Sequence, residues 1–246
     1  KRIIQTIIKT RTGSTQGKGP GEMIAILFKN GIKKIGAGDV QIGDENVEVK
    51  GNRGRLISAG AGSGAALFTN GRHVIETKLQ ELSTMIKSSE FNEYLSLDLN
   101  DIRSINLKQS AFMPNSGWLA LRDEALGLGV SEEAFVNWFA SIFSSEDGIW
   151  KNGCDHEEEL RDGIRKFFED PKDPIEFLTF LGYHSLLYYS KVDDFSRIMV
   201  VSPVNQKIVH FRVDAGYEAF RNLYVCKVGP QWQDSQNHNV FGIEIR

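Results

Sequence analysis

The hydrophobic period of this chain changes along its length, and this change limits the folds that the chain can adopt. Near both ends, apolar residues alternate with polar residues at a period of two, which is typical of half-buried β-strands. In the middle, they recur every three or four residues, which is typical of amphipathic helices. This order of elements predicts an α/β or α+β chain with a helical insertion.

The expected strands are short and lie on both sides of the helices, at residues 32–35, 39–42, 47–50, 197–202, 207–213, 223–228 and 240–245. The expected helices cover residues 22–29, 73–87, 132–143, 155–168 and 174–190. Ser131 and Asp173 precede two of these helices, where their side chains can accept a hydrogen bond from a free backbone N–H. Residues 95–120 follow neither period, and we expect them to be irregular with one strand at most.

These patterns divide the chain into four expected segments. Residues 1–19 end in small polar residues and glycines, which favours an N-terminal arm or linker. Residues 20–68 are the expected core unit, and residues 69–192 are the mainly helical insertion. Residues 193–246 are expected to add strands to the core or to form a small β-rich end.

The composition excludes several classes of protein. In 246 residues, 41% are hydrophobic and 25% are charged, which argues against a disordered tail, a coiled coil or a collagen-like chain. No apolar run approaches the ~18 residues that a membrane-spanning helix needs, and residues 1–9 are too short and too charged for a secretory signal. Cys154 and Cys226 provide neither a disulfide framework nor a zinc pattern. We therefore expect an intracellular, cytoplasmic protein with reduced thiols.

The charge of the chain is distributed unevenly. Residues 1–60 contain eleven Lys and Arg against five Asp and Glu, a net charge of +6, whereas the rest of the chain carries −9. A basic segment joined to an acidic remainder favours a face that binds a polyanion. A solvated basic surface would explain the charge equally well.

The segment between Gly38 and Gly51 predicts a hairpin with two different faces. We expect residues 43–46 to form the turn and Ile42 to pair with Val47. Because side chains alternate along a strand, one face is then wholly apolar, and a helix can pack on it. The other face is wholly polar and carries Asp39, Gln41, Glu48 and Lys50.

The polar face suggests a metal site. Asp39 and Glu48 would be diagonal neighbours, roughly 7–8 Å apart at the backbone, and two such carboxylates can share one hard divalent cation such as Mg²⁺. Lys50 would bring a positive charge to a bound phosphate or lower the pKa of an attacking water. Glu22, near the start of the preceding helix, could supply a third carboxylate.

This arrangement resembles the PD-(D/E)XK nuclease superfamily, whose members share a restriction-endonuclease-like fold with Holliday-junction resolvases and many phage nucleases. The matching residues are Glu22, Asp39 and the tripeptide Glu48-Val49-Lys50. Gly38 stands in place of the proline of the motif, as it does in many members. The resemblance implies a mixed sheet core and metal-assisted hydrolysis of nucleic-acid phosphodiesters.

The resemblance also implies roles for these residues. Asp39, Glu48 and the carbonyl oxygen of Val49 would hold Mg²⁺, or Mn²⁺ in its place, with Glu22 assisting. Lys50 would orient or activate the attacking water. The implied protein is a DNA endonuclease that acts in the cytoplasm, or in the host cytoplasm if it is viral, with no membrane contact. The breadth of the family makes a phage or mobile-element origin attractive, and many of its members work as homodimers.

Basic residues near this motif are candidates for phosphate contacts. These nucleic-acid-binding candidates are Arg53, Arg55, Lys18, Lys33 and Lys34. Three alternatives stay open: an exposed hairpin whose charges merely pair with one another, a nucleic-acid-binding or viral structural protein that keeps the nuclease fold without catalysis, and a protein-interaction scaffold that uses acidic helices within residues 131–190. The residues around His184 in the sequence are mostly apolar or aromatic, which indicates that this histidine lies in the core or at an interface.

Overall fold

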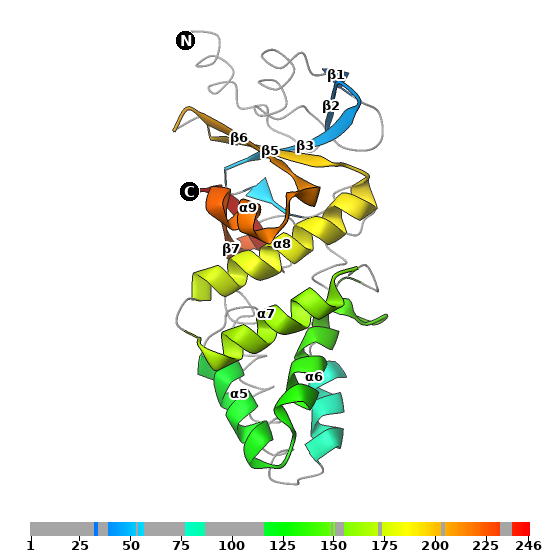
Figure 1. Cartoon of the computed structure of the whole chain (residues 1–246), viewed down its shortest axis with the longest axis vertical. Coiled ribbons are helices and arrows are strands. Elements are labelled where there is room, and N and C mark those ends of the chain that lie inside the picture. The colour runs from blue at the N-terminus through cyan, green and yellow to red at the C-terminus, as the bar shows by residue number, and fades with distance from the viewer. Residues whose placement is uncertain are drawn as a thin grey trace.

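The strands of the chain form two β-sheets, and the helices pack below the larger sheet in the computed structural model (Figure 1). The structure describes residues 32–33, 39–52, 54–56, 77–86, 116–148, 150, 155–171, 174–202, 205–231 and 238–246. The expectation of a mixed α/β chain is confirmed. No helix in these ranges is both long enough and apolar enough to cross a lipid bilayer.

The larger sheet has five strands in the order β1-β2-β3-β5-β6. These strands are β1 (Ile32–Lys33), β2 (Val40–Ile42), β3 (Glu45–Gly51), β5 (Arg197–Ser202) and β6 (Lys207–Arg212). Strands β3 and β5 are parallel, and the other neighbouring pairs are antiparallel. Most of the described helices lie between β3 and β5 in the sequence, which agrees with the long connection that a parallel pair requires.

The smaller sheet has the order β4-β8-β7 and is antiparallel. It consists of β4 (Gly54–Arg55), β7 (Tyr224–Gln231) and β8 (His238–Ile245). Both sheets therefore combine strands from before residue 69 with strands from after residue 193. The strands expected at residues 223–228 and 240–245 are confirmed as a hairpin, and both are longer than expected.

The first helix within the described ranges covers residues 77–86. It is followed by α5 (Ser116–Gly127), α6 (Glu132–Ser144), α7 (Glu157–Glu169), α8 (Pro174–Asp193), the 3₁₀ turn η1 (Val213–Ala215) and α9 (Tyr217–Leu223). The predicted cap of α6 is confirmed, because the side chain of Ser131 accepts a hydrogen bond from the N–H of Ala134. The helix predicted at residues 22–29 lies outside the described residues.

Residues 95–120 were expected to be irregular, and this expectation is wrong for residues 116–120, which form the start of α5. The apolar residues of α5 do not fall on one clear stripe, so the period of 3.6 is weak there. Its burial shows why it is nevertheless helical: Leu121 and Ala125, four residues apart, are buried in the main core. Packing against the neighbouring helices compensates for the weak local pattern.

The hairpin register also differs from the expected one. Val40 pairs with Val47 and Ile42 with Glu45, so the turn is only Gly43-Asp44. Gly43 has φ +62°, which glycine adopts readily at the first position of a two-residue hairpin turn. The shift is of two residues, an even number, so the predicted division into a polar and an apolar face is retained.

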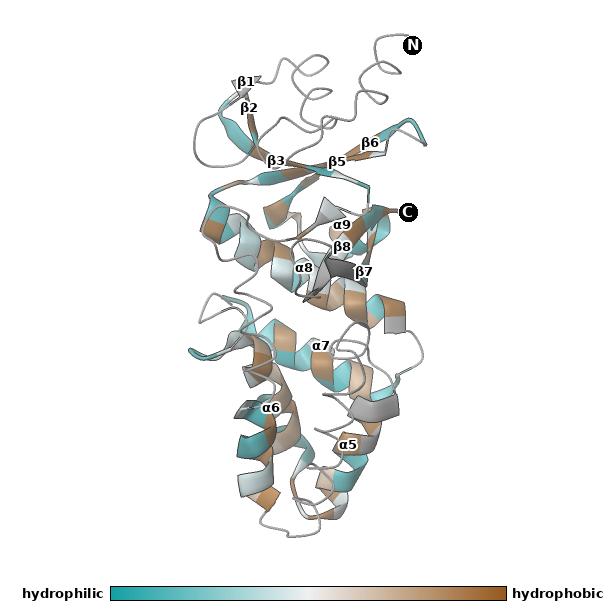
Figure 2. Cartoon of the chain, turned by 180° about the vertical axis from the view of Figure 1, so that it is seen from behind, coloured by the Kyte–Doolittle hydropathy of each residue, from teal (hydrophilic) through white to brown (hydrophobic). Residues whose placement is uncertain are grey.

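The layers follow one another from the sheet to the far helices. Helix α8 crosses below the five-stranded sheet, α7 lies below α8, and α5 and α6 lie at the far end (Figures 1 and 2). Helix α7 alternates apolar and polar segments along its ribbon (Figure 2). Its buried residues are Leu160, Ile164, Phe167 and Phe168. The main core therefore runs from the sheet through the helices.

Candidate functional site

Strand β3 presents Glu48 and Lys50 on the side of the sheet that faces α8. Their partners on β5 are Ile198 and Val200, which belong to the main core. Among the described helices, α8 therefore packs on the polar side of the hairpin, and the expectation that a helix packs on its apolar face stays a prediction. Helix α8 covers the polar side because β5 adds apolar residues to that side of the sheet.

The apolar residues of the hairpin are buried on the opposite face. Val40, Val47 and Val49 form a separate small cluster with Met199 and Val201 of β5. Each face of β3 is thus matched to the corresponding face of β5. This matching is the packing that holds the Glu48-Val49-Lys50 backbone in place.

Glu48, Lys50 and Tyr189 of α8 form a compact polar cluster. The Nζ atom of Lys50 lies 2.6 Å from Oε1 of Glu48. The hydroxyl of Tyr189 donates a hydrogen bond of 2.5 Å to the same carboxylate oxygen and accepts one of 3.0 Å from Nζ of Lys50. Glu48 is only 5% exposed, so its carboxylate depends on these partners rather than on bulk water.

The pKa of Tyr189 reflects the burial of its hydroxyl and the carboxylates around it. Burial raises the pKa of the Tyr189 hydroxyl far above its ordinary value, and the negative charge of Glu48 adds to this shift. Asp39 contributes in the same direction, although it is a smaller cause. The Tyr189 hydroxyl is therefore a neutral hydrogen-bond donor at physiological pH.

Asp39 lies beside the same tripeptide. Its Oδ2 atom accepts a hydrogen bond of 2.9 Å from the N–H of Val49, and its own N–H donates to the carbonyl oxygen of Val47 at 3.1 Å. The structure thus places Asp39 next to the tripeptide that carries Glu48 and Lys50, although the expected pairing of the two strands differs from the observed one by two residues.

The oxygen atoms at this site have the chemistry that Mg²⁺ prefers, namely two carboxylates and a carbonyl. In an extended strand, the N–H and C=O of one residue point toward the same neighbouring strand. The N–H of Val49 bonds to Asp39, so the carbonyl of Val49 is directed to the Asp39 side of β3. The donor set therefore fits a divalent cation. However, among the described residues no three His, Cys, Asp or Glu side chains gather as a metal site.

The other predicted site residues are not placed here. Glu22, Lys18, Lys34 and Arg53 lie outside the described residues. Lys33 falls on β1 and Arg55 on β4, and for these two only the backbone is described.

Sequence reasoning missed Tyr189. It stands in an apolar and aromatic helix, where a tyrosine is usually part of the core, and it is indeed only 4% exposed. The available signal was that a buried tyrosine hydroxyl needs a hydrogen-bond partner. Local spacing cannot identify that partner, because Glu48 lies 141 residues earlier in the chain.

Comparisons with known proteins identify no relative of this chain. No family model, no curated protein and no solved structure matches the chain. The functional argument therefore rests on the residues of the site.

Proposed function

We propose that this chain is a Mg²⁺-dependent nuclease, specifically a DNA endonuclease, built on a restriction-endonuclease-like core. The observation that carries the proposal is the position of Asp39, whose carboxylate bonds to the backbone of Val49 between Glu48 and Lys50. Asp39 thus lies beside the tripeptide that carries Glu48 and Lys50, whose side chains pair with each other at 2.6 Å. The parallel pairing of β3 with β5 and the flanking helices are compatible with such a core.

Asp39, Glu48 and the carbonyl of Val49 would hold the cation. When bound, Mg²⁺ polarises the phosphoryl oxygen, helps to ionise water and neutralises the leaving oxygen. Lys50 supplies a positive charge close to the position of the phosphate, which stabilises the charge that develops during hydrolysis. Tyr189 holds the Glu48 carboxylate and Lys50 in one orientation through its two hydrogen bonds.

A second candidate is a nucleic-acid-binding protein that keeps this core without hydrolysis. The observation that favours it is the close ion pair of Glu48 and Lys50, at 2.6 Å and largely buried. In this arrangement the two charges neutralise each other and serve the stability of the fold.

Purified protein incubated with plasmid, single-stranded DNA and RNA separates these functions. The nuclease predicts cleavage of DNA with Mg²⁺, none with EDTA, and a loss of at least about 100-fold in Glu48→Gln and Lys50→Met. Lys227→Met is the matched control, because Lys227 lies on β7 and pairs with Glu244. Circular dichroism of each variant checks that it is folded.

Intact DNA with a retarded gel band in Mg²⁺ would instead support the binding protein. Cleavage that persists in EDTA, or in folded Glu48→Gln protein, would contradict the nuclease proposal because the activity would then come from elsewhere.

A further inference from the structure

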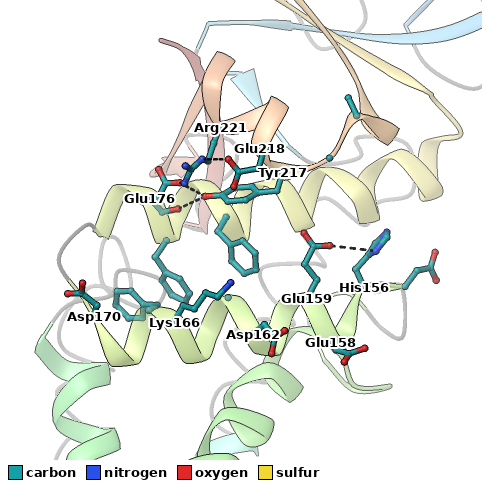
Figure 3. A pocket seen from close by; sticks show the side chains of 17 residues that line it. His156, Glu158, Glu159, Asp162, Lys166, Asp170, Glu176, Tyr217, Glu218 and Arg221 are labelled. Carbon is teal, nitrogen blue, oxygen red and sulfur yellow. Dashed lines mark hydrogen bonds and ion pairs between the residues drawn. The ribbon is translucent and has the colours of Figure 1, made fainter.

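The ion pairs of this molecule differ in how far they are open to water. In the groove between α7, the start of α8 and α9, Arg221 pairs with Glu176 and with Glu218, and these side chains are between 31% and 75% exposed (Figure 3). Such exposed pairs contribute little to stability. The pair of Glu48 and Lys50 is different, because the Glu48 side chain is only 6% exposed and water screens its charge poorly.

One oxygen of the Glu48 carboxylate already has two donors. Nζ of Lys50 lies 2.6 Å from Oε1, and the hydroxyl of Tyr189 donates to the same atom at 2.5 Å. The proposed metal site uses this carboxylate. A divalent cation at Glu48 would meet the ammonium of Lys50, and two positive charges this close in a buried site repel each other strongly. Lys50 and the cation therefore compete for Glu48.

Of the three side chains in the cluster, Lys50 is the one that can move. Tyr189 is fixed in the core, where its ring packs edge to face on Phe195 with centroids 4.9 Å apart. The Lys50 side chain is 18% exposed against 6% for Glu48, and it has a flexible four-carbon stem. Its ammonium can thus leave Glu48 while the other two side chains stay in place.

Tyr189 offers Lys50 a partner after this movement. Nζ of Lys50 donates a hydrogen bond of 3.0 Å to the Tyr189 hydroxyl and lies 5.0 Å from the ring centroid, which is within cation–π range. The hydroxyl oxygen can go on accepting this hydrogen bond when a cation takes Glu48. The ammonium therefore keeps one of its two partners.

Asp39 gives a divalent cation the advantage in this competition. Its carboxylate lies beside the same tripeptide and accepts a hydrogen bond from the N–H of Val49. The attraction between charges grows with their product. A cation with two positive charges that interacts with Asp39 and Glu48 together is therefore held more strongly than the single charge of Lys50.

We propose that Lys50 occupies the place of the metal on Glu48 in the metal-free chain, and that its ammonium moves to Tyr189 when a divalent cation binds. This inference rests on the proposed metal site. Its consequence is an order of events, because the charge of Lys50 becomes available to a phosphate only after the cation is bound. Before that, the pair with Glu48 neutralises it.

Calorimetric titration of the full chain with MgCl₂ and with MnCl₂, without DNA, tests the competition. Lys50→Met removes the competing charge and should bind either cation at least tenfold more tightly than the unchanged chain, although it should lose cleavage. Lys50→Arg keeps the charge and should bind the cations as weakly as the unchanged chain. Lys227→Met is the control for net charge, because Lys227 pairs with Glu244 in the smaller sheet, and its cation affinity should not change.

A crystal structure of the unchanged chain with Mn²⁺ adds a measurement that needs no variant. Nζ of Lys50 should lie more than about 4 Å from both carboxylate oxygens of Glu48 and within hydrogen-bond distance of the Tyr189 hydroxyl. Manganese on Glu48 with Lys50 still paired to it, or equal cation affinities in folded Lys50→Met and Lys50→Arg, would overturn this inference and leave the metal site intact. A complete lack of cation binding in all these proteins would overturn the metal site as well.

Discussion

The hydroxyl of Tyr189 lies between two groups of opposite charge. It donates to the buried carboxylate of Glu48 and accepts from Lys50, while the Lys50 ammonium also lies 5.0 Å from the centre of the tyrosine ring. A phenylalanine at this position would keep the ring and lose both hydrogen bonds. The hydroxyl can therefore be tested separately from the packing.

Tyr189→Phe is expected to lower the free energy of unfolding by about 1–3 kcal/mol, because a buried carboxylate loses one of its partners. Urea unfolding measures this loss. Tyr188→Phe is the control, since it removes a neighbouring hydroxyl that takes no part in the cluster, and it should cost much less. Equal losses in the two variants would contradict a specific role of the Tyr189 hydroxyl.

His184 shows a different effect of burial. It is 1% exposed and is surrounded by rings, with Phe180 at 4.6 Å and Trp150 at 6.1 Å between centroids. Burial lowers the pKa of His184 to about 3, and the nearby His156 adds a smaller effect in the same direction. The expectation of a core histidine agrees with this position.

The lowered pKa of His184 predicts acid sensitivity. Between pH 6.5 and about 3, His184 is protonated in the unfolded chain but stays neutral in the folded chain. Proton binding therefore favours the unfolded chain, and the free energy of unfolding falls as the pH decreases from 6.5 toward about 3. This one group contributes up to about 1.4 kcal/mol per pH unit. Urea unfolding between pH 7.5 and 4.5 should show a smaller slope in His184→Leu than in the unchanged chain. Identical slopes would contradict the prediction.

At the scale of single elements, a glycine inside α7 permits close packing of two helices. A Cβ atom at Gly163 would lie 2.2 Å from Cζ of Phe180 on α8. The Phe180 ring cannot easily move aside, because it also contacts Tyr217 at 5.2 Å and His184 edge to face. The sequence alone shows only an unfavourable residue in a helix, whereas the packing explains its presence.

Gly163→Ala is therefore expected to destabilise the protein by about 1–3 kcal/mol through overpacking, although alanine by itself favours a helix. Gly127→Ala is the matched control, because a Cβ at Gly127 meets no atom within 4 Å. Its stability should be unchanged or slightly higher. A stabilised Gly163→Ala protein in thermal unfolding would show that α7 and α8 are less closely packed than the structure indicates.

At the scale of the whole molecule, Asn52 connects the two sheets. Its backbone N–H donates to the carbonyl of Val201 on β5 at 2.9 Å. Its side-chain Oδ1 accepts a hydrogen bond of 2.9 Å from the N–H of Ile245 on β8. One residue after β3 thus holds both the larger and the smaller sheet.

Asn52→Ala should cost about 1–3 kcal/mol, because the N–H of Ile245 loses its acceptor. Hydrogen exchange should show the loss at Ile245 and its neighbours on β8, with little change on β5. Asn52→Asp keeps an acceptor oxygen and serves as the control. Faster exchange on both sheets to the same extent would argue against a local link.

The short-range parts of this fold could be predicted from the sequence. Most helices and strands lie close to the residues expected from their hydrophobic periods, and the polar face of the hairpin was correct despite the wrong register. A shift of two residues leaves every side chain on its face. The hydrophobic pattern therefore predicts the face on which each side chain lies, but not the length of the turn. Helix α5 was missed because its stability comes from packing rather than from its own pattern.

The sequence by itself determined the order of elements, the uneven charge, and the identity of Asp39, Glu48 and Lys50 as neighbours on one face. Only the tertiary structure decided that β3 lies parallel to β5, that α8 covers the polar face, and that Tyr189 completes the cluster. The physical reason is the range of the interactions. Alternation and capping depend on residues a few positions apart, whereas pairing and burial depend on contacts between segments that are far apart in the chain.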